Sequence, residues 1–301
     1  MNINGRLIGK EYEPLIISEI GINHGGNIEI AKKMVFAAYK AGAECIKHQT
    51  HFVEDEMTEE AKDIYPPNAN ISIWDVIKNN SLSREDEIIL KEYTEDLGMI
   101  YLSTPFSRSA ADFLNDIGVP AFKIGSGEAD NIPLIRHISK FKKPIILSTG
   151  MQNINSIKKS VEIIANANIE FALLECTNLY PSPPEIVSLK GIKELEATFP
   201  DAIIGFSDHS IGPTMSLASV SLGASIIERH FTDSRYRIGP DISCSMDPSE
   251  LKFLIERSKE IYIARNNPKK RTKAEESVYK FARGSIVADR DLEEGITLSE
   301  A

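Results

Sequence analysis

The stretch Ala121-Phe-Lys-Ile-Gly-Ser-Gly-Glu128 predicts a short buried strand, 121–124, that runs into a glycine-rich turn. Lys123 places a cation inside this strand, where a purely structural strand would carry an apolar residue. The two glycines let backbone amides approach an anion, and Ser126 adds a hydroxyl donor. Glu128 adds a carboxylate just beyond the turn. A buried lysine paired with a glutamate is also a common structural feature. This stretch alone therefore does not indicate a binding site, and the other strands of the chain have to be compared with it.

Seven further short apolar runs resemble this strand, and longer amphipathic runs separate them. The predicted strands are 15–20, 45–50, 99–103, 121–124, 144–148, 171–176, 202–206 and 225–228. Helical periodicity is found at 28–41, 84–97, 109–117, 132–140, 154–167, 185–199, 212–222 and 248–265. Strands that alternate with helices indicate parallel βαβ units, and eight such units close a (β/α)8 TIM barrel. An open doubly wound sheet is the alternative α/β fold.

Changes in composition divide the chain. We expect an N-terminal extension at 1–14, the TIM-barrel catalytic domain at 15–265 and a basic linker at 266–275. Residues 276–301 contain two short β-like runs around a turn, and they predict the opening of a small β domain that the chain does not finish. The connection at 52–83 is long, and we interpret it as a functional loop over the barrel mouth, with a partly mobile excursion as the alternative.

The overall charge restricts the partners of the protein. A net charge of −10 disfavours binding to nucleic acid or to a membrane surface, so an anionic substrate would need a local cluster of cations. The three cysteines have no metal-binding spacing, and we expect them to be reduced and buried in a cytoplasmic protein. No signal peptide or membrane span is expected from the sequence.

Polar residues end every predicted strand. In a parallel barrel these carboxyl ends form the active site. The polar ends are 19–24, 47–51, 103–106, 123–128, 148–150, 177–180, 207–209 and 228–230. A purely structural barrel would not place hydrogen-bonding side chains at all eight ends, so the set predicts a binding site.

One group of these residues suits an anion. Lys47 and Lys123 lie two strands apart, which is roughly 10 Å before the side chains converge inward. Neutral donors surround them, namely Thr104, Ser126, Ser148, Asn178 and Ser207. This ring predicts a small ligand with two anionic groups. For Lys47, an ion pair with Glu19 is the alternative.

A second group suits a metal ion. His209 and His230 end the adjacent seventh and eighth strands, so that both imidazoles could reach one ion. Imidazoles with water and carboxylate suit manganese, iron, cobalt or zinc, and two histidines leave positions open for substrate. Hydrogen-bonded core histidines are the alternative. Asp241, in the loop after the eighth strand, could bind the hydroxyls of a polyol or could simply stabilise a turn.

These motifs together resemble one enzyme family. Glu19-Ile-Gly-Ile-Asn-His24, Lys47-His-Gln-Thr-His51, Lys123-Ile-Gly-Ser-Gly-Glu128, Ser207-Asp-His209 and Glu228-Arg-His-Phe-Thr232 are similar, in order and spacing, to the bacterial N-acetylneuraminate (sialic acid) synthases over about residues 12–300. The resemblance implies a TIM barrel that condenses phosphoenolpyruvate with N-acetylmannosamine and water, giving N-acetylneuraminate and phosphate. It also implies a divalent metal, Mn²⁺ or Mg²⁺.

The resemblance assigns roles position by position. His209 and His230 correspond to the metal ligands, and Glu19 and Glu128 to the central acid–base carboxylates. The residues that correspond to the phosphoenolpyruvate site are Lys47, Thr104, Lys123, Ser126, Ser148, Asn178 and Ser207. The residues that correspond to the amino-sugar site are Gln49, Asn68, Tyr180 and Asp241.

The chain departs from the family near its end. Relatives continue into a complete antifreeze-like (SAF) domain, which reaches the partner's barrel in a domain-swapped homodimer and places an arginine near the sugar. Here residues 281–301 match only the opening of that domain, so the stretch expected to hold the arginine is missing.

Other functions remain open. A Schiff-base aldolase would use Lys47 or Lys123 as its nucleophile and would need no metal. A truncated, non-catalytic paralogue that binds the same ligands is a second alternative. Within the family, synthases of legionaminic or pseudaminic acid are a third.

Overall fold

A computed structural model describes residues 1–65 and 70–297 of the chain. The chain divides into two compact units, Met1–Arg265 and Asn266–Ala301. The first unit contains the site, and the description below follows it from the strands outward.

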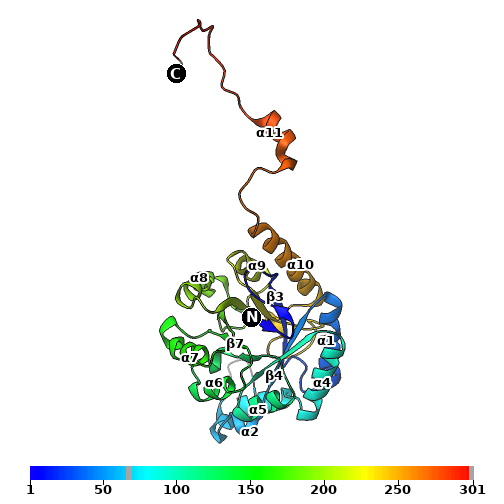
Figure 1. The fold of residues 1–301 in the computed structure, drawn as a ribbon. Coiled ribbons are helices and arrows are strands. Elements are labelled where there is room, and N and C mark those ends of the chain that lie inside the picture. Colours follow the sequence, from blue (N-terminus) through cyan, green and yellow to red (C-terminus); the bar gives the residue numbers. More distant parts are fainter. Residues whose placement is uncertain (66–69, 298–301) are drawn as a thin grey trace. The chain divides into compact units, whose positions relative to one another are not determined.

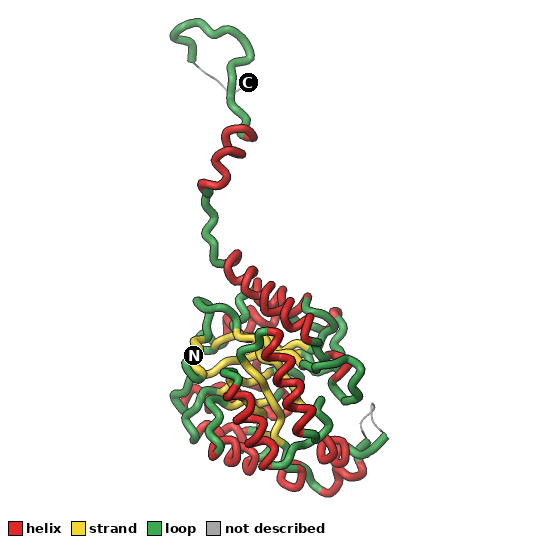
Figure 2. Tube along the Cα trace, turned by 90° about the vertical axis from the view of Figure 1, so that its right-hand side faces the viewer, coloured by secondary structure: helices red, strands yellow, loops and turns green. Residues whose placement is uncertain are grey.

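In the described part of the chain, eight parallel strands close into a barrel, in the order β10-β3-β4-β5-β6-β7-β8-β9. Their bounds are Leu15–Gly21 (β3), Cys45–Thr50 (β4), Ile100–Pro105 (β5), Phe122–Ile124 (β6), Ile145–Ser148 (β7), Phe171–Cys176 (β8), Ile203–Asp208 (β9) and Ile226–His230 (β10). Helices surround the strands, as the red and yellow elements of Figure 2 show. The predicted TIM barrel is therefore confirmed, and the open doubly wound sheet is wrong.

The helices follow the predicted amphipathic runs closely (Figure 1). They are Ile28–Ala41 (α1), Arg84–Asp96 (α4), Arg108–Asp116 (α5), Ile132–Ser139 (α6), Ile154–Asn166 (α7), Leu189–Thr198 (α8), Thr214–Ser221 (α9) and Pro248–Arg265 (α10). α1 illustrates why the bounds could be predicted. The side chain of Asn27 accepts a hydrogen bond from the amide of Ile30, and Gly42 ends the helix at a φ of 96°.

Side chains inside the barrel change character along each strand. Near the amino-terminal ends the inward positions are apolar, as in Ile17, Cys45 and Ile226, which belong to one buried cluster. Two residues further along, the same face carries Glu19, Lys47 and Glu228, because alternate residues of a strand share a face. The barrel therefore has an apolar lower half and a polar upper half.

An N-terminal hairpin closes the apolar end. β1 (Asn2–Ile3) pairs with β2 (Arg6–Leu7), and Figure 1 shows the N-terminus over the middle of the barrel. Ile3 and Ile8 are buried in the apolar cluster of the barrel interior. The stretch 1–14, expected to be an extension, thus includes a plug for the barrel.

We expect Ile8→Asp to lower the free energy of unfolding by about 3 kcal/mol or more, because it places a carboxylate in an apolar interior. Leu7→Asp is the matched control, since Leu7 is 44% exposed whereas Ile8 is 1% exposed. Urea unfolding followed by circular dichroism measures both variants. Equal midpoints would contradict the role of the hairpin as a plug.

The long connection at 52–83 contains helices. α2 (Val53–Glu56), a 3-10 turn (Glu59–Asp63) and α3 (Ile73–Asn80) enclose a small apolar cluster of their own. Residues 66–69, which include the candidate Asn68, lie outside the described residues.

The second unit differs from its expected β character. It contains a short helix, α11 (Glu276–Ala282), and residues 283–297 form no strand. Ile286 and Val287, in the first β-like run, are exposed, so no partner strand covers them there. Across the described chain, no helix is long and apolar enough to cross a membrane.

Candidate active site

A cavity of about 130 Å³ lies at the carboxyl ends of the barrel strands. It is lined by side chains from seven of the eight strands and from the loops that follow them. Alternate residues of a strand share a face, so each of these strands can direct its side chains into the cavity. The polar lining residues are Lys47, Gln49, Thr104, Lys123, Ser126, Ser148, Asn178, Tyr180, Ser207, His209, Glu228 and His230.

Four buried charges occupy its base. Lys47 forms an ion pair with Glu19 and lies 3.8 Å from Oε1 of Glu228. Lys123 lies 3.7 Å from the same oxygen. Two cations and two carboxylates thus share one small volume. The Lys47–Glu19 ion pair, which the sequence analysis gave as the alternative to anion binding by Lys47, is present, and the ring of neutral donors is present as well.

The cluster shifts the pKa values of its members. Burial alone would lower the pKa of Lys47, but the carboxylates of Glu19 and Glu228 outweigh it and raise that pKa. Burial raises the pKa of Glu19 in spite of the opposing charge of Lys47. Lys123 is farther from a carboxylate, and burial lowers its pKa.

Hydroxyl groups hold the two lysines from neighbouring strands. Nζ of Lys47 donates to Oγ1 of Thr104 at 3.1 Å, and Nζ of Lys123 donates to Oγ of Ser148 at 2.7 Å. Oγ of Ser207 lies 3.4 Å from Oε1 of Glu228. Both ammonium groups therefore point into the barrel, where an anionic ligand could exchange places with the carboxylate contacts.

The two candidate metal ligands lie side by side. The ring centroids of His209 and His230 are 5.4 Å apart, and Tyr180 packs on His209 at 4.0 Å. Nδ1 of His209 donates to the carbonyl oxygen of Thr177 at 2.8 Å, which leaves Nε2 with a free lone pair.

The chemistry of this pair fits a divalent metal. Burial lowers the pKa of His209 and lowers that of His230 well below its usual value, which favours the neutral form that binds metal ions. Nδ1 of His230 is buried without a hydrogen-bond partner and lies 3.5 Å from a carboxylate oxygen of Asp241. The described residues contain no group of three or more His, Cys, Asp or Glu side chains that could hold a metal ion. A metal here would therefore need ligands from substrate or water.

Asp241 approaches the cavity from the loop after β10. Burial, together with the charge of Glu19, raises the pKa of Asp241 to about 7. Its backbone carbonyl accepts a hydrogen bond of 2.7 Å from Ser245, whose hydroxyl oxygen accepts one of 2.9 Å from Asn23. Asn23 thus ties the loop after β3 to the loop that carries Asp241.

The two candidate carboxylates occupy different places. Glu19 lies in the charge cluster, whereas Glu128 does not line the cavity and accepts a hydrogen bond from Asn131. Glu228 lines the cavity, and the sequence analysis named it only as part of a strand end. Its spacing of two residues from His230 is the signal that could have identified it, since both residues must share a face of β10.

The three cysteines are free and buried, as expected. Cys176 lines the cavity between Ser148 and Ser207, and burial raises the pKa of its thiol to about 11.

Outward-facing residues at the same strand ends anchor the surrounding loops. Asp208 alternates with Ser207 and His209, and it accepts hydrogen bonds from the amide of Ser210 at 2.8 Å and from the hydroxyl of Ser216. Arg229 donates to the carbonyl of Ser210 at 2.5 Å. The loop after His209 is thereby tied to the outside of the barrel.

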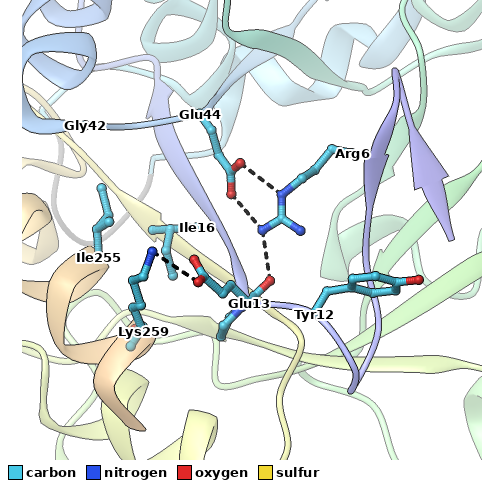
Figure 3. A pocket seen from close by; sticks show the side chains of 10 residues that line it. Arg6, Tyr12, Glu13, Ile16, Gly42, Glu44, Ile255 and Lys259 are labelled. Atoms are coloured by element: carbon cyan, nitrogen blue, oxygen red, sulfur yellow. Dashed lines mark hydrogen bonds and ion pairs between the residues drawn. The ribbon is translucent and has the colours of Figure 1, made fainter. Parts of the chain in front are cut away.

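A second cavity, of about 400 Å³, is lined by residues near the amino-terminal ends of β3 and β4 (Figure 3). Its charged groups are already paired within the protein. Arg6 contacts Glu44 through two nitrogens at 2.9 Å, and Lys259 lies 3.1 Å from Glu13. Its cations therefore have carboxylate partners, and its described lining contains no histidine.

Comparisons with known proteins agree with this arrangement. The sequence profile of the NeuB family matches residues 34–270. An uncharacterized protein of Methanocaldococcus jannaschii is 37% identical over 301 residues, which cover 99% of this chain and 86% of the relative. The N,N'-diacetyllegionaminic acid synthase of Campylobacter jejuni is 36% identical over 296 residues, which cover 95% of this chain and 88% of the relative.

Solved structures show the same relationship. The crystal structure of an N-acetylneuraminic acid (sialic acid) synthetase from Leptospira borgpetersenii, in complex with citrate, has a TM-score of 0.85 and 28% identity, and the match covers 93% of this chain and 95% of that one. The chain therefore belongs to the NeuB family of synthases that make sialic acid and related nonulosonic acids.

Proposed function

We propose that the protein condenses phosphoenolpyruvate with N-acetylmannosamine and water to form N-acetylneuraminate and phosphate. The observation that carries this proposal is the convergence of Lys47 and Lys123 on one small polar cavity at the carboxyl ends of the strands. Phosphoenolpyruvate carries a phosphate and a carboxylate, and two buried ammonium groups with hydroxyl donors around them suit such a ligand.

The chain's own residues have separable roles in this reaction. Lys47, Lys123 and the hydroxyls of Thr104 and Ser148 bind the anionic groups and orient C3 of phosphoenolpyruvate toward the aldehyde carbon of the open-chain sugar. As the new C–C bond forms, the aldehyde oxygen takes up a proton and C2 becomes electron-poor. The carboxylate of Glu228, between the two lysines, offsets that developing positive charge.

Water then completes the reaction at C2. A carboxylate at the base of the cavity, Glu19 or Glu228, accepts one proton of the attacking water, which balances the proton taken up by the aldehyde oxygen. The C2–oxygen bond to phosphate then breaks, and phosphate leaves with the remaining proton of the new hydroxyl group, so that C2 becomes the ketone. Tyr180, Gln49, Asp241 and Asn68 are the proposed sugar-site residues. Glu128 keeps its proposed acid–base role only if its side chain turns toward the cavity when substrate binds.

His209 and His230 would hold the divalent metal, Mn²⁺ or Mg²⁺. When bound, the metal would supply Lewis-acid polarisation of the sugar aldehyde. The support is the pair of adjacent, buried imidazoles described above, whose pKa values burial lowers.

Phosphate release from phosphoenolpyruvate tests the proposal. We expect release that requires the sugar, stops with EDTA and returns with Mn²⁺, because the imidazole pair suits such an ion. His209→Ala should abolish this release, whereas His137→Ala, at a surface histidine of α6, should retain it. Release without sugar, or release that resists EDTA, would contradict the proposal. A panel of acceptor sugars decides between N-acetylneuraminate, legionaminate and pseudaminate synthesis.

One observation favours a different enzyme. The lowered pKa of Lys123 is a property that a Schiff-base nucleophile needs. Borohydride with pyruvate would then trap a covalent adduct on Lys123, and an unmodified Lys123 excludes that mechanism.

The domain-swapped homodimer stays a prediction. Loops at the carboxyl ends of the strands expose several large apolar side chains, which supports a second copy covering the cavity mouth. These side chains are Met151, Leu179, Ile211, Tyr236 and Ile238.

A further inference from the structure

A chain of hydrogen bonds connects α2 with the buried carboxylate of Glu19. Oε2 of Glu56, the last residue of α2, lies 2.8 Å from Nδ1 of His51. Nε2 of His51 lies 3.1 Å from Oε1 of Gln49, and Nε2 of Gln49 donates to Oε1 of Glu19 at 3.1 Å. Gln49 lines the cavity, whereas His51 and Glu56 do not.

Charge determines the direction of these bonds. The ammonium of Lys47 contacts the other oxygen of Glu19, so this carboxylate is an acceptor toward Gln49. The amide nitrogen of Gln49 must therefore face Glu19, and its carbonyl oxygen must face His51. A carbonyl oxygen only accepts, so Nε2 of His51 has to carry a proton. The carboxylate of Glu56 also only accepts, so Nδ1 of His51 carries a second proton. If Nε2 of His51 did not donate a hydrogen bond, the side-chain amide of Gln49 would flip and exchange the positions of its oxygen and nitrogen.

Packing keeps the imidazole in place. Its ring stacks on Phe106 with centroids 4.1 Å apart and an angle of 15° between the planes. Glu56 holds the opposite nitrogen, and the hydroxyl of Ser109 in α5 donates to Asp55 of the same short helix. His51 is therefore held by Gln49, Phe106 and Glu56, although it does not itself line the cavity.

We propose that His51 is a positioning residue that sets the polarity of the Gln49 amide. Held in this way, Gln49 has used its carbonyl oxygen and one N–H on protein partners. It can still offer a ligand its second N–H, whereas the lone pair that remains on its carbonyl oxygen lies on the side of His51, which does not line the cavity. The group of the acceptor sugar that meets Gln49 is then an oxygen with a free lone pair, and an ammonium substituent at that position is disfavoured. This specificity rests on the proposed function, whereas the orientation of the amide does not.

Histidine NMR tests the orientation without turnover. In protein labelled with ¹⁵N-histidine, the His51 signals are those lost in His51→Phe, which keeps an aromatic ring against Phe106. We expect Nε2 of His51 to carry a proton in the wild-type protein at neutral pH. An unprotonated Nε2 would mean that the Gln49 amide points the other way, and it would overturn the proposal whether or not the enzyme is active.

A double-mutant cycle tests the consequence. His51→Phe should raise KM for the acceptor sugar by about tenfold and leave KM for phosphoenolpyruvate unchanged. In a Gln49→Ala background, the same substitution should change KM by less than about twofold, because the residue through which His51 acts is gone. His137→Phe on α6 is the matched control, a partly exposed histidine paired with Asp112.

The remaining outcomes are also decisive. Equal effects of His51→Phe in both backgrounds, or an equal rise in both KM values, would assign His51 a general structural role and overturn the proposal. If the wild-type protein turns over no sugar of the panel, the proposed function fails, and the NMR measurement alone decides the orientation of Gln49.

Discussion

Lys47→Met is expected to abolish phosphate release and to lower the free energy of unfolding at pH 7 by about 3–5 kcal/mol. The substitution leaves Glu19 and Glu228 as two buried carboxylates with only Lys123 nearby, at 3.7 Å from Glu228. Turnover should fall about 10³-fold or more, because a preorganised cation is lost from the site where the anion binds. Steady-state phosphate release and urea unfolding measure the two effects.

The stability loss should depend on pH in a defined direction. Burial already raises the pKa of Glu19 above its ordinary value of 4.5, and the loss of the Lys47 charge raises that pKa further. The folded variant then binds more protons than the unfolded chain, so its stability is retained at low pH and falls as the pH rises. Adding Glu228→Gln should restore stability but not turnover. Stability of Lys47→Met that does not vary with pH would contradict the charge cluster.

Gly150→Ala is expected to weaken phosphoenolpyruvate binding by about 100-fold, with only a small change in the unfolding midpoint. A Cβ at this position would lie 2.2 Å from Oδ1 of Asn178 and 2.9 Å from Oγ of Ser126, so both side chains must move. The amide of Gly150 also donates to Oγ of Ser126 at 3.0 Å. Isothermal titration calorimetry with phosphoenolpyruvate measures the loss.

Gly127→Ala is the matched control for this experiment. A Cβ on Gly127 meets no atom within 4 Å, although Gly127 itself lines the cavity. We expect Gly127→Ala to bind phosphoenolpyruvate with near wild-type affinity. Equal losses in the two variants would show that the close approach at Gly150 is not what shapes the site.

The fold could be predicted from the sequence because its signals are local. Each strand is a short apolar run, and each helix has its own period and its own stop signal, as Gly42 shows for α1. The polar strand ends could be predicted for the same reason, since Lys47, Lys123 and Ser148 lie within strands whose alternation fixes the inward face.

The choice of carboxylate could not be predicted in this way. β6 has only three residues, and Glu128 lies four residues beyond its end, in a 3-10 turn (Ser126–Glu128) where strand alternation no longer applies. Glu228 lies within β10, so its inward direction follows from that of His230. The contacts of His51 with Glu56 likewise depend on how the long connection folds, which no periodicity in the sequence specifies.

The switch from apolar to polar side chains along each strand also constrains how this protein can evolve. A one-residue insertion or deletion within β4 would exchange the faces of Lys47 and His48, and it would remove the ammonium group from the cavity while burying an imidazole there. Insertions or deletions in the loops that follow the strands do not change which strand residues face the cavity. New preferences for the acceptor sugar should therefore arise in connections such as 231–247, which carries Asp241. The strands tolerate substitutions, but they do not tolerate an insertion or deletion that exchanges their inward-facing and outward-facing side chains.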